Sequence, residues 1–152
     1  MTVKPIPDGY HTITPYLLVS GVPDLIAFLK EAFGAREVHR MMRPDGKLMH
    51  AEVRIGNSAV MMGEPTSELG PMPSSMYLYV EDCDAVYQRA VGAGGASVME
   101  PTDMPFAGER YGGVKDPSGN IWWVATHIED VSPAEQAKRA EVFFRQQQGH
   151  GA

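Results

Sequence analysis

Three polar residues at alternate positions of one predicted strand are the first candidates for chemistry in this chain. His50, Glu52 and Arg54 alternate with the apolar residues of the segment 50–55, and successive side chains of a strand point to opposite faces of its sheet. His50 and Glu52 therefore share a face, where a histidine beside a carboxylate can act as a general base. Solvated strand residues, or an ion pair between Glu52 and Arg54, explain the same pattern, and both interpretations stay open.

A duplicated unit must position these residues. The run Tyr16-Leu17-Leu18-Val19 recurs 61 residues later as Tyr77-Leu78-Tyr79-Val80, and Gly56-Asn57 recurs as Gly119-Asn120 after a slip of two residues. Hydrophobic periodicity and turn residues predict the order β-α-β-β-β in both copies. A duplicated half-domain of this kind builds a pseudo-symmetric sheet.

The predicted units divide the chain into two modules and one additional helix. The modules cover about 12–62 and 75–127, within a single domain of residues 1–152. A linker with three prolines joins them. A capping-box sequence, Ser132-Pro133-Ala134-Glu135, then predicts a helix over about 132–145, followed by a frayed tail.

Composition limits the classes of partner and compartment. The net charge of −6 argues against nucleic acid or an anionic membrane as a partner. Cys83 is the only cysteine, so no internal disulfide can form, as is usual in a reducing compartment. The first residues do not resemble a signal peptide, and the sequence has no apolar run of membrane-spanning length. We therefore expect a cytoplasmic protein.

Several motifs connect this chain to a known family. They lie at 13–17, 32–35, 44–52 and 114–122, with a further match over 124–131. On these motifs the chain resembles the vicinal oxygen chelate superfamily, and in particular its PhnB-like glyoxalase/bleomycin-resistance branch. The resemblance implies an α+β fold in which two tandem βαβββ modules form a cupped mixed sheet with helices on the convex face. It also implies a homodimer.

The same resemblance locates four positions that hold metal ligands in the metal-using members. They fall at Thr14, Val60, Ser75 and Trp123. A divalent transition metal needs imidazole, carboxylate or thiolate donors, and neither valine nor tryptophan can ligate. We therefore expect no metal cofactor. Metal-dependent glyoxalase or dioxygenase chemistry is the alternative that this expectation disfavours.

If the resemblance places Thr14, Ser75 and Trp123 on the concave side, strand parity places further residues there. The expected aromatic residues are Tyr16, Tyr77, Tyr79 and Trp123, with His50, Glu52 and Arg54 as the polar groups. Stacking of such rings on a planar ligand contributes about 0.5–1.5 kcal/mol beyond area burial. Alternatively, the rings fill a closed cavity or pack at a dimer interface.

The segment 104–111 is expected at the mouth of the cavity. Phe106 with Gly108 would form a lid, and Arg110 would meet an anionic ligand. The competing interpretation is a hairpin whose surface arginine pairs with Glu109 or Asp103. His127, at a strand end, is expected to be structural.

Three functional hypotheses follow. The first is a homodimer that binds a small, partly aromatic molecule in a metal-free cavity, of the resistance or sequestration type. The second is an isomerase- or lyase-type enzyme of the superfamily that uses His50 and Glu52. The third is a non-catalytic protein whose dimer and C-terminal helix serve a macromolecular partner.

Overall fold

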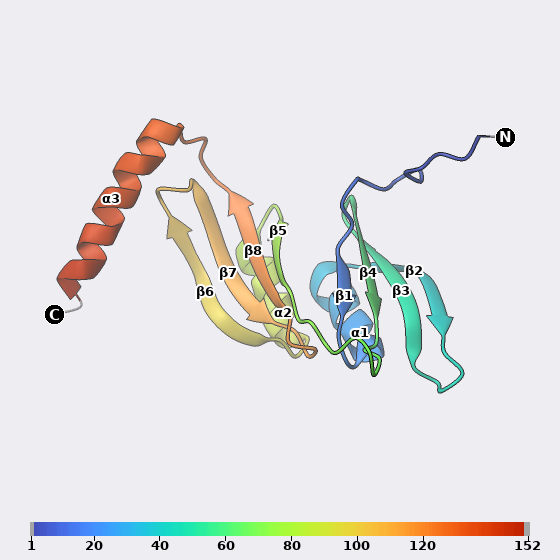
Figure 1. Cartoon of the computed structure of the whole chain (residues 1–152). Coiled ribbons are helices and arrows are strands. Elements are labelled where there is room, and N and C mark those ends of the chain that lie inside the picture. Colours follow the sequence, from blue (N-terminus) through green and yellow to red (C-terminus); the bar gives the residue numbers. More distant parts are fainter. Residues whose placement is uncertain (1, 151–152) are drawn as a thin grey trace.

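The computed structural model describes residues 2–150 and contains two βαβββ modules followed by a helix (Figure 1). In chain order the elements are β1 (Tyr16–Leu18), α1 (Val22–Phe33), β2 (Arg36–Met42), β3 (Leu48–Ile55), β4 (Ser58–Gly63), β5 (Ser75–Tyr79), α2 (Cys83–Gly92), β6 (Ala96–Met104), β7 (Glu109–Lys115), β8 (Ile121–His127) and α3 (Pro133–His150). The predicted order of elements is confirmed in both modules.

Each module forms its own four-stranded mixed sheet. The strand orders are β1-β4-β3-β2 and β5-β8-β7-β6. In each sheet the first strand runs parallel to the last strand of the module, and the other pairs are antiparallel. Tyr16 pairs with Met61 in the first sheet, as Tyr77 pairs with Trp123 in the second. The α+β fold expected from the sequence is therefore confirmed, with matched registers in its two halves.

The two helices α1 and α2 lie next to each other on the inner side of the two sheets, behind them in the view of Figure 1. One continuous core joins both modules: Val53 and Met62 from the first sheet share it with Val114 and Trp122 from the second. The ring of Phe33, at the end of α1, lies 5.1 Å from that of Trp122. Since alternate strand residues point to opposite sides, the remaining side chains of each sheet face outward.

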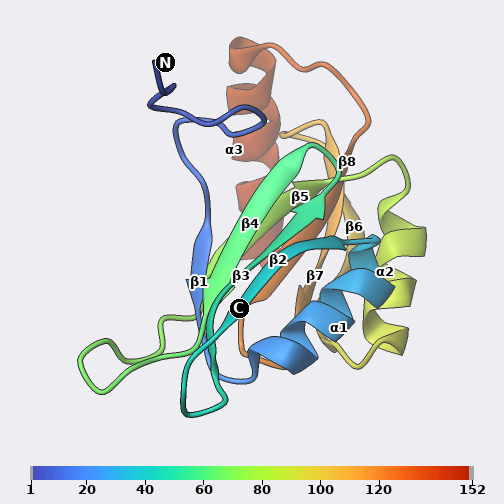
Figure 2. The ribbon, with the colours of Figure 1, turned by 90° about the vertical axis from the view of Figure 1, so that its right-hand side faces the viewer.

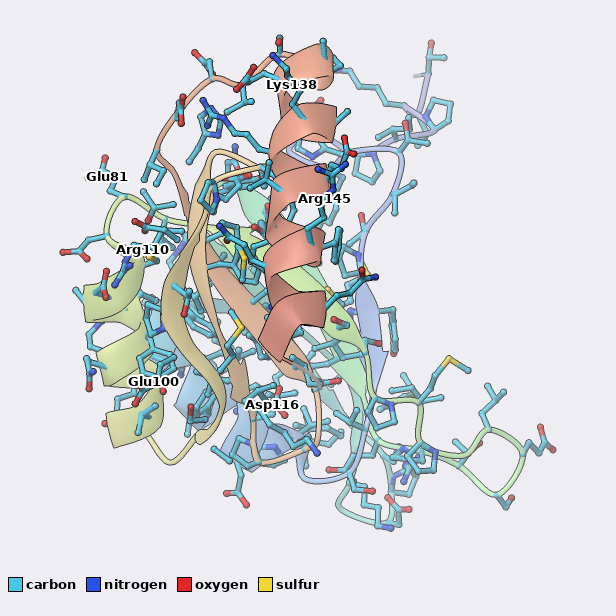
Figure 3. All side chains as sticks on the ribbon, turned by 90° about the vertical axis from the view of Figure 1, so that its left-hand side faces the viewer. Glu81, Glu100, Arg110, Asp116, Lys138 and Arg145 are labelled. Carbon is cyan, nitrogen blue, oxygen red and sulfur yellow. The ribbon has the colours of Figure 1, made fainter. Side chains whose placement is uncertain are left out.

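The outward surfaces of the two sheets consequently point away from each other. We call the outward surface of β1-β4-β3-β2 the N-terminal face and that of β5-β8-β7-β6 the C-terminal face. Figure 2 looks towards the first sheet from its outer side, and Figure 3 looks towards the second sheet from the opposite side. The two modules of one chain therefore do not close a cavity between their concave faces.

Local sequence signals explain where the first two helices begin and end. Gly34 ends α1 with φ of 66°, a left-handed conformation that glycine adopts without steric cost, and its N–H donates to Lys30. Asp82 precedes α2, and its carboxylate accepts the backbone N–H of Ala85. Both ends are as the sequence predicts.

The strand β6 is longer than the sequence suggests. The sequence pattern alone predicts only a short strand at 97–99, whereas β6 covers Ala96–Met104. Pro101 lies within it, which is tolerated because β6 is the outermost strand of its sheet and has an irregular register at this point. The expected loop 104–111 is thereby reduced to a turn at 105–108.

The last helix, α3, projects beside the second sheet and is held mainly at its N-terminal half (Figures 1 and 3). The guanidinium of Arg139 donates to both carboxylate oxygens of Glu129, at 2.8 and 2.9 Å, and to the carbonyl of Pro105 at 3.0 Å. Ser132 accepts the N–H of Glu135, as expected for the cap.

The helix continues to His150, so residues 146–150 are helical rather than frayed, and 151–152 lie outside the described residues. Across residues 2–150, we find no helix with the length and apolar character needed to span a bilayer.

Candidate functional site

A row of four aromatic rings crosses the C-terminal face. The ring centroids of Tyr79 and Tyr77 are 5.2 Å apart, those of Tyr77 and Tyr111 5.9 Å, and those of Tyr111 and Trp123 6.0 Å. Tyr77 is 46% exposed and Tyr79 62% exposed. The predicted residues Tyr77, Tyr79 and Trp123 thus lie together, and they present a continuous aromatic surface to the outside.

Trp123 has a fixed position within this row. Its indole N–H donates to the hydroxyl of Ser75 at 2.9 Å. Its ring lies against Gly113, where a Cβ atom would come within 2.7 Å of the indole. Gly113 pairs directly with Trp123 between β7 and β8. A glycine at this position lets the large ring lie against the backbone of the neighbouring strand.

The turn before β8 positions the strand that carries Trp123. One oxygen of the buried Asp116 accepts hydrogen bonds from the backbone N–H groups of Ser118 and Asn120. The other accepts hydrogen bonds from the side-chain N–H groups of Asn120 and Trp122. Because Trp122 is anchored in the core, the next residue must point to the C-terminal face.

A buried carboxylate lies at one end of the aromatic row. Glu109 is 8% exposed, and its Oε1 accepts the hydroxyl of Tyr79 at 2.7 Å. Its Oε2 is buried without a hydrogen-bond donor, and it lies 3.4 Å from Nδ1 of His127. Nε2 of His127 lies 2.7 Å from Asp130. His127 therefore sits between two carboxylates.

These contacts shift the protonation of the groups at this end of the face. The hydrogen bond with Asp130, with a further contribution from Glu109, raises the pKa of His127. The hydrogen bond to Glu109 raises the pKa of Tyr79. Burial, together with the charge of Glu109, raises the pKa of Tyr77 to about 12. The tyrosines therefore remain neutral hydrogen-bonding groups at ordinary pH.

Sequence reasoning missed two residues of this surface, Glu109 and Tyr111. Glu109 was considered only as a partner of Arg110, and Tyr111 only as the end of a loop. The signal was present in the alternation of Glu109, Tyr111 and Gly113 with residues of the other face. It was obscured because the strand β7 begins inside the segment expected to be a loop.

The N-terminal face holds a second buried carboxylate. Glu52 is 3% exposed, and both of its oxygens lie 2.7 Å from the hydroxyl of Tyr10. Nε of Arg54 lies 3.7 Å from Glu52, and the guanidinium carbon lies 4.6 Å from the ring centroid of Tyr10. The ion-pair interpretation of the strand pattern is confirmed, and Glu52 is held by neighbours on its own face.

His50 and Glu52 are hydrogen-bonded to different tyrosines. Its Nδ1 lies 3.4 Å from the hydroxyl of Tyr16, with the two rings 5.6 Å apart. The hydrogen bonds of residues 2–150 include none between His50 and Glu52. Parity correctly places both side chains on one face, but the structure does not assemble them into a general-base pair.

One of the four family ligand positions was wrong. Val60 is 4% exposed and belongs to the central core, whereas Met61 pairs with Tyr16 and lies on the N-terminal face. The cause is the length of the turns. Ile55 pairs with Ser58 around a two-residue turn, but the equivalent turn of the second module is longer, so equal counting reaches opposite faces.

The corrected positions do not fit a transition metal. Thr14, Met61, Ser75 and Trp123 offer no imidazole and no carboxylate, and the hydroxyl of Ser75 is used by the indole of Trp123. Within residues 2–150, no group of three or more His, Cys, Asp or Glu side chains is placed to hold an ion.

Two predicted ligand contacts lie elsewhere. Arg110 points to the helix side of its sheet, near α2 (Figure 3), where it donates to Asp84 at 2.8 and 2.9 Å and to Asp103 at 3.0 Å. Its interpretation as a surface arginine paired with Asp103 is therefore the correct one. Phe106 packs under α3, with its ring 5.1 Å from that of Phe143.

The fold and its duplicated concave faces define a class of protein. Residues 10–124 match the family model described as the Glyoxalase/Bleomycin resistance protein/Dioxygenase superfamily. The chain therefore belongs to this family, as the sequence motifs suggested.

Individual relatives support the same assignment. The uncharacterized protein Rv0887c of Mycobacterium tuberculosis is 37% identical over 135 residues, which cover 81% of this chain and 78% of the relative. TioX from Micromonospora sp. ML1 has a TM-score of 0.63 at 22% identity, covering 80% of this chain and 100% of TioX. The PhnB protein from Bacillus cereus has a TM-score of 0.57 at 18% identity, covering 76% of this chain and 99% of PhnB. These two structures share the fold.

Proposed function

We propose that this protein binds a small molecule with an aromatic part, and that the aromatic row of the C-terminal face is the binding surface. The observation that carries the proposal is the run of four neighbouring rings ending at Trp123. Aromatic walls with a few polar groups are typical of small-molecule sites. Planar ligands gain stacking energy on such rings.

Binding alone, as in resistance or sequestration, requires affinity and no chemical step. The alternative isomerase or lyase function would need His50 and Glu52 to act together, and each is instead bound to a tyrosine. The side chains at the four positions that hold metal ligands in related enzymes are poor metal donors, which favours binding of the small molecule without a metal ion. The negative net charge disfavours nucleic acid and anionic membranes, and a single cysteine suits the cytoplasm.

A second copy of the chain completes the site in this proposal. The two faces of one chain diverge from each other, so each is open on its own. Apolar side chains are exposed on both, including Tyr16 and Met41 on the N-terminal face and Tyr77 and Tyr79 on the C-terminal face. In a homodimer, the N-terminal module of one copy would pair edge to edge with the C-terminal module of the other, so that the two curved sheets enclose a shared cavity.

Tryptophan fluorescence tests the binding surface directly, because the chain has only two tryptophans and Trp122 is buried. We expect planar aromatic compounds to change the emission of the protein through Trp123. The matched variant Trp123→Phe keeps an aromatic ring and the signal of Trp122, but should lose the response. If no compound of a broad aromatic panel changes the emission, or if Trp123→Phe responds like the parent, the proposal fails.

A further inference from the structure

The unpartnered oxygen of Glu109 indicates what kind of ligand the aromatic row accepts. We propose that this ligand carries a positively charged nitrogen, and that Glu109 is its anchor. The inference rests on the proposed function, since it assigns the charge of a molecule that the C-terminal face would bind. It adds a chemical class, an aromatic organic cation, to that proposal.

The carboxylate of Glu109 lacks one donor. Tyr79 satisfies Oε1, while Oε2 is buried and accepts no hydrogen bond. A buried carboxylate oxygen without a donor is costly, and nearly all such groups in folded proteins are paired. The environment of Glu109 therefore lacks one hydrogen-bond donor.

Neutral His127 does not supply that donor. A neutral imidazole has a single N–H, and Nε2 of His127 lies 2.7 Å from Asp130. When the proton is on Nε2, the lone pair of Nδ1 faces Oε2 of Glu109 at 3.4 Å. Only the imidazolium ion satisfies both carboxylates. The carboxylates of Glu109 and Asp130 together favour one positive charge between them, which either His127 or a bound cation provides.

A ligand cation can reach this position from the aromatic row. The side chain of His127 is half exposed and that of Asp130 fully exposed, so turning the imidazole outward uncovers Oε2 of Glu109. Tyr79 and Tyr77 lie beside it with exposed rings, and aromatic faces attract cations. An ammonium group would then bind Glu109 while its aromatic part lies along the tyrosines towards Trp123.

The charges around Glu109 agree with this assignment. Arg110, its neighbour on β7, is turned to the helix side and bound to Asp84 and Asp103. Lys115 is at the opposite end of β7. Arg139 is bound to Glu129 and Glu135. The end of the face that holds Glu109 and Asp130 therefore favours a cation over an anion.

Three probes of equal shape and different charge test the proposal on the full chain. They are 2-naphthylmethylamine, 2-naphthylmethanol and 2-naphthoate, measured by calorimetry at a pH of about 8.5, where a primary amine keeps its proton. We expect the amine to bind roughly tenfold or more tightly than the alcohol, as for one charge-assisted hydrogen bond, and the acid to bind most weakly.

A pair of variants assigns the preference to a residue. Glu109→Gln keeps an acceptor for Tyr79 and should reduce the preference for the amine over the alcohol to about twofold or less. The control Glu100→Gln removes the same charge from the exposed outer strand β6 and should keep the preference.

The outcomes separate the two proposals. Equal binding of all three probes, abolished by Trp123→Ala, would leave the aromatic site standing and overturn the cationic ligand. A preference for the amine that survives Glu109→Gln would overturn Glu109 as the anchor. The absence of binding by any probe would count against the aromatic site itself. The comparison of probes on the unaltered protein is decisive even if the Glu109 variant folds poorly.

Discussion

At the scale of single residues, the most informative group is His127, because the structure gives it two carboxylate neighbours. Its ordinary pKa is 6.5, and Asp130 and Glu109 raise that value in the folded chain. A histidine with a raised pKa stabilises the fold at pH values below 6.5. That contribution is lost as the pH rises through the folded-state pKa.

We therefore expect nuclear magnetic resonance titration to give a pKa above 6.5 for His127 and a lower value in Asp130→Asn. The reason is that the variant replaces the charged acceptor at Nε2 by a neutral amide, and the hydrogen bond with the Asp130 carboxylate is the largest cause of the shift. The other histidines in the same spectra serve as internal controls and should not move. A titration of His127 that is the same in both proteins would show that Asp130 does not hold the imidazole.

The sequence identified part of the site at this scale and missed the rest. Parity placed His50, Glu52 and Arg54 on one face correctly, since β3 has a regular alternation. It could not show that Tyr10, 42 residues earlier, returns to bind Glu52. Contacts of this kind depend on how a segment outside the sheet crosses its surface, which no local pattern specifies.

At the scale of elements, α3 is attached to the second module by few contacts. None of the residues described in the helix is buried, and its contacts concentrate at Arg139 and around Phe106. Gly108 adds a point of attachment, because its carbonyl accepts the N–H groups of Ile128 and Glu129 in the segment leading to the helix. The helix can therefore separate from the module without disturbing the central core.

We expect Arg139→Gln to increase hydrogen exchange of the α3 amides by roughly tenfold while the melting temperature of the domain changes little. The substitution removes a two-point interaction with Glu129 and a bond to the carbonyl of Pro105, and such surface pairs contribute about 0.2–1 kcal/mol each. Arg145→Gln, which removes a pair within the helix to Glu141, is the matched control. Equal exchange in both variants would contradict the role given to Arg139.

The order and type of the elements were predictable because each carries a strong local signal. Gly34 and Asp82 mark helix ends, and the duplicated pattern repeats the strands. Positions that depend on turn length were not predictable in the same way. Because the turn after Ile55 has only two residues, counting from it placed Val60 on the outward face, whereas Val60 lies in the core. The side of the sheet on which Arg110 lies was missed because the segment 104–111 was treated as the mouth of a cavity, whereas Arg110 lies in the strand β7.

At the scale of the whole molecule, the two open, diverging faces lead to the predicted dimer. We expect sedimentation to give about 33 kDa at micromolar concentration, twice the 16.6 kDa of the chain. A mass of a single chain at that concentration would contradict the dimer. The measurement is needed because the fold describes a single chain and does not by itself determine the oligomeric state.

A mixing experiment tests whether each cavity combines faces from two copies. Met61→Arg blocks the N-terminal face and Trp123→Ala removes a ring from the C-terminal face, so either homodimer should bind no ligand. After exchange of subunits, about half of the dimers are mixed, and each has one intact cavity, which gives about a quarter of the sites of the parent protein. Full binding by Met61→Arg alone would show that one chain is sufficient.

The divergence of the two faces has a consequence for how such a protein would release its cargo. In the proposed dimer, a bound molecule would touch both subunits, because one chain alone leaves its two faces open, and it would be lost when the subunits separate. Each bound ligand then favours association by mass action. Dilution of the protein would therefore release the ligand, and a high ligand concentration would promote dimerisation. The apparent affinity for the ligand would then depend on the concentration of the protein in the cell.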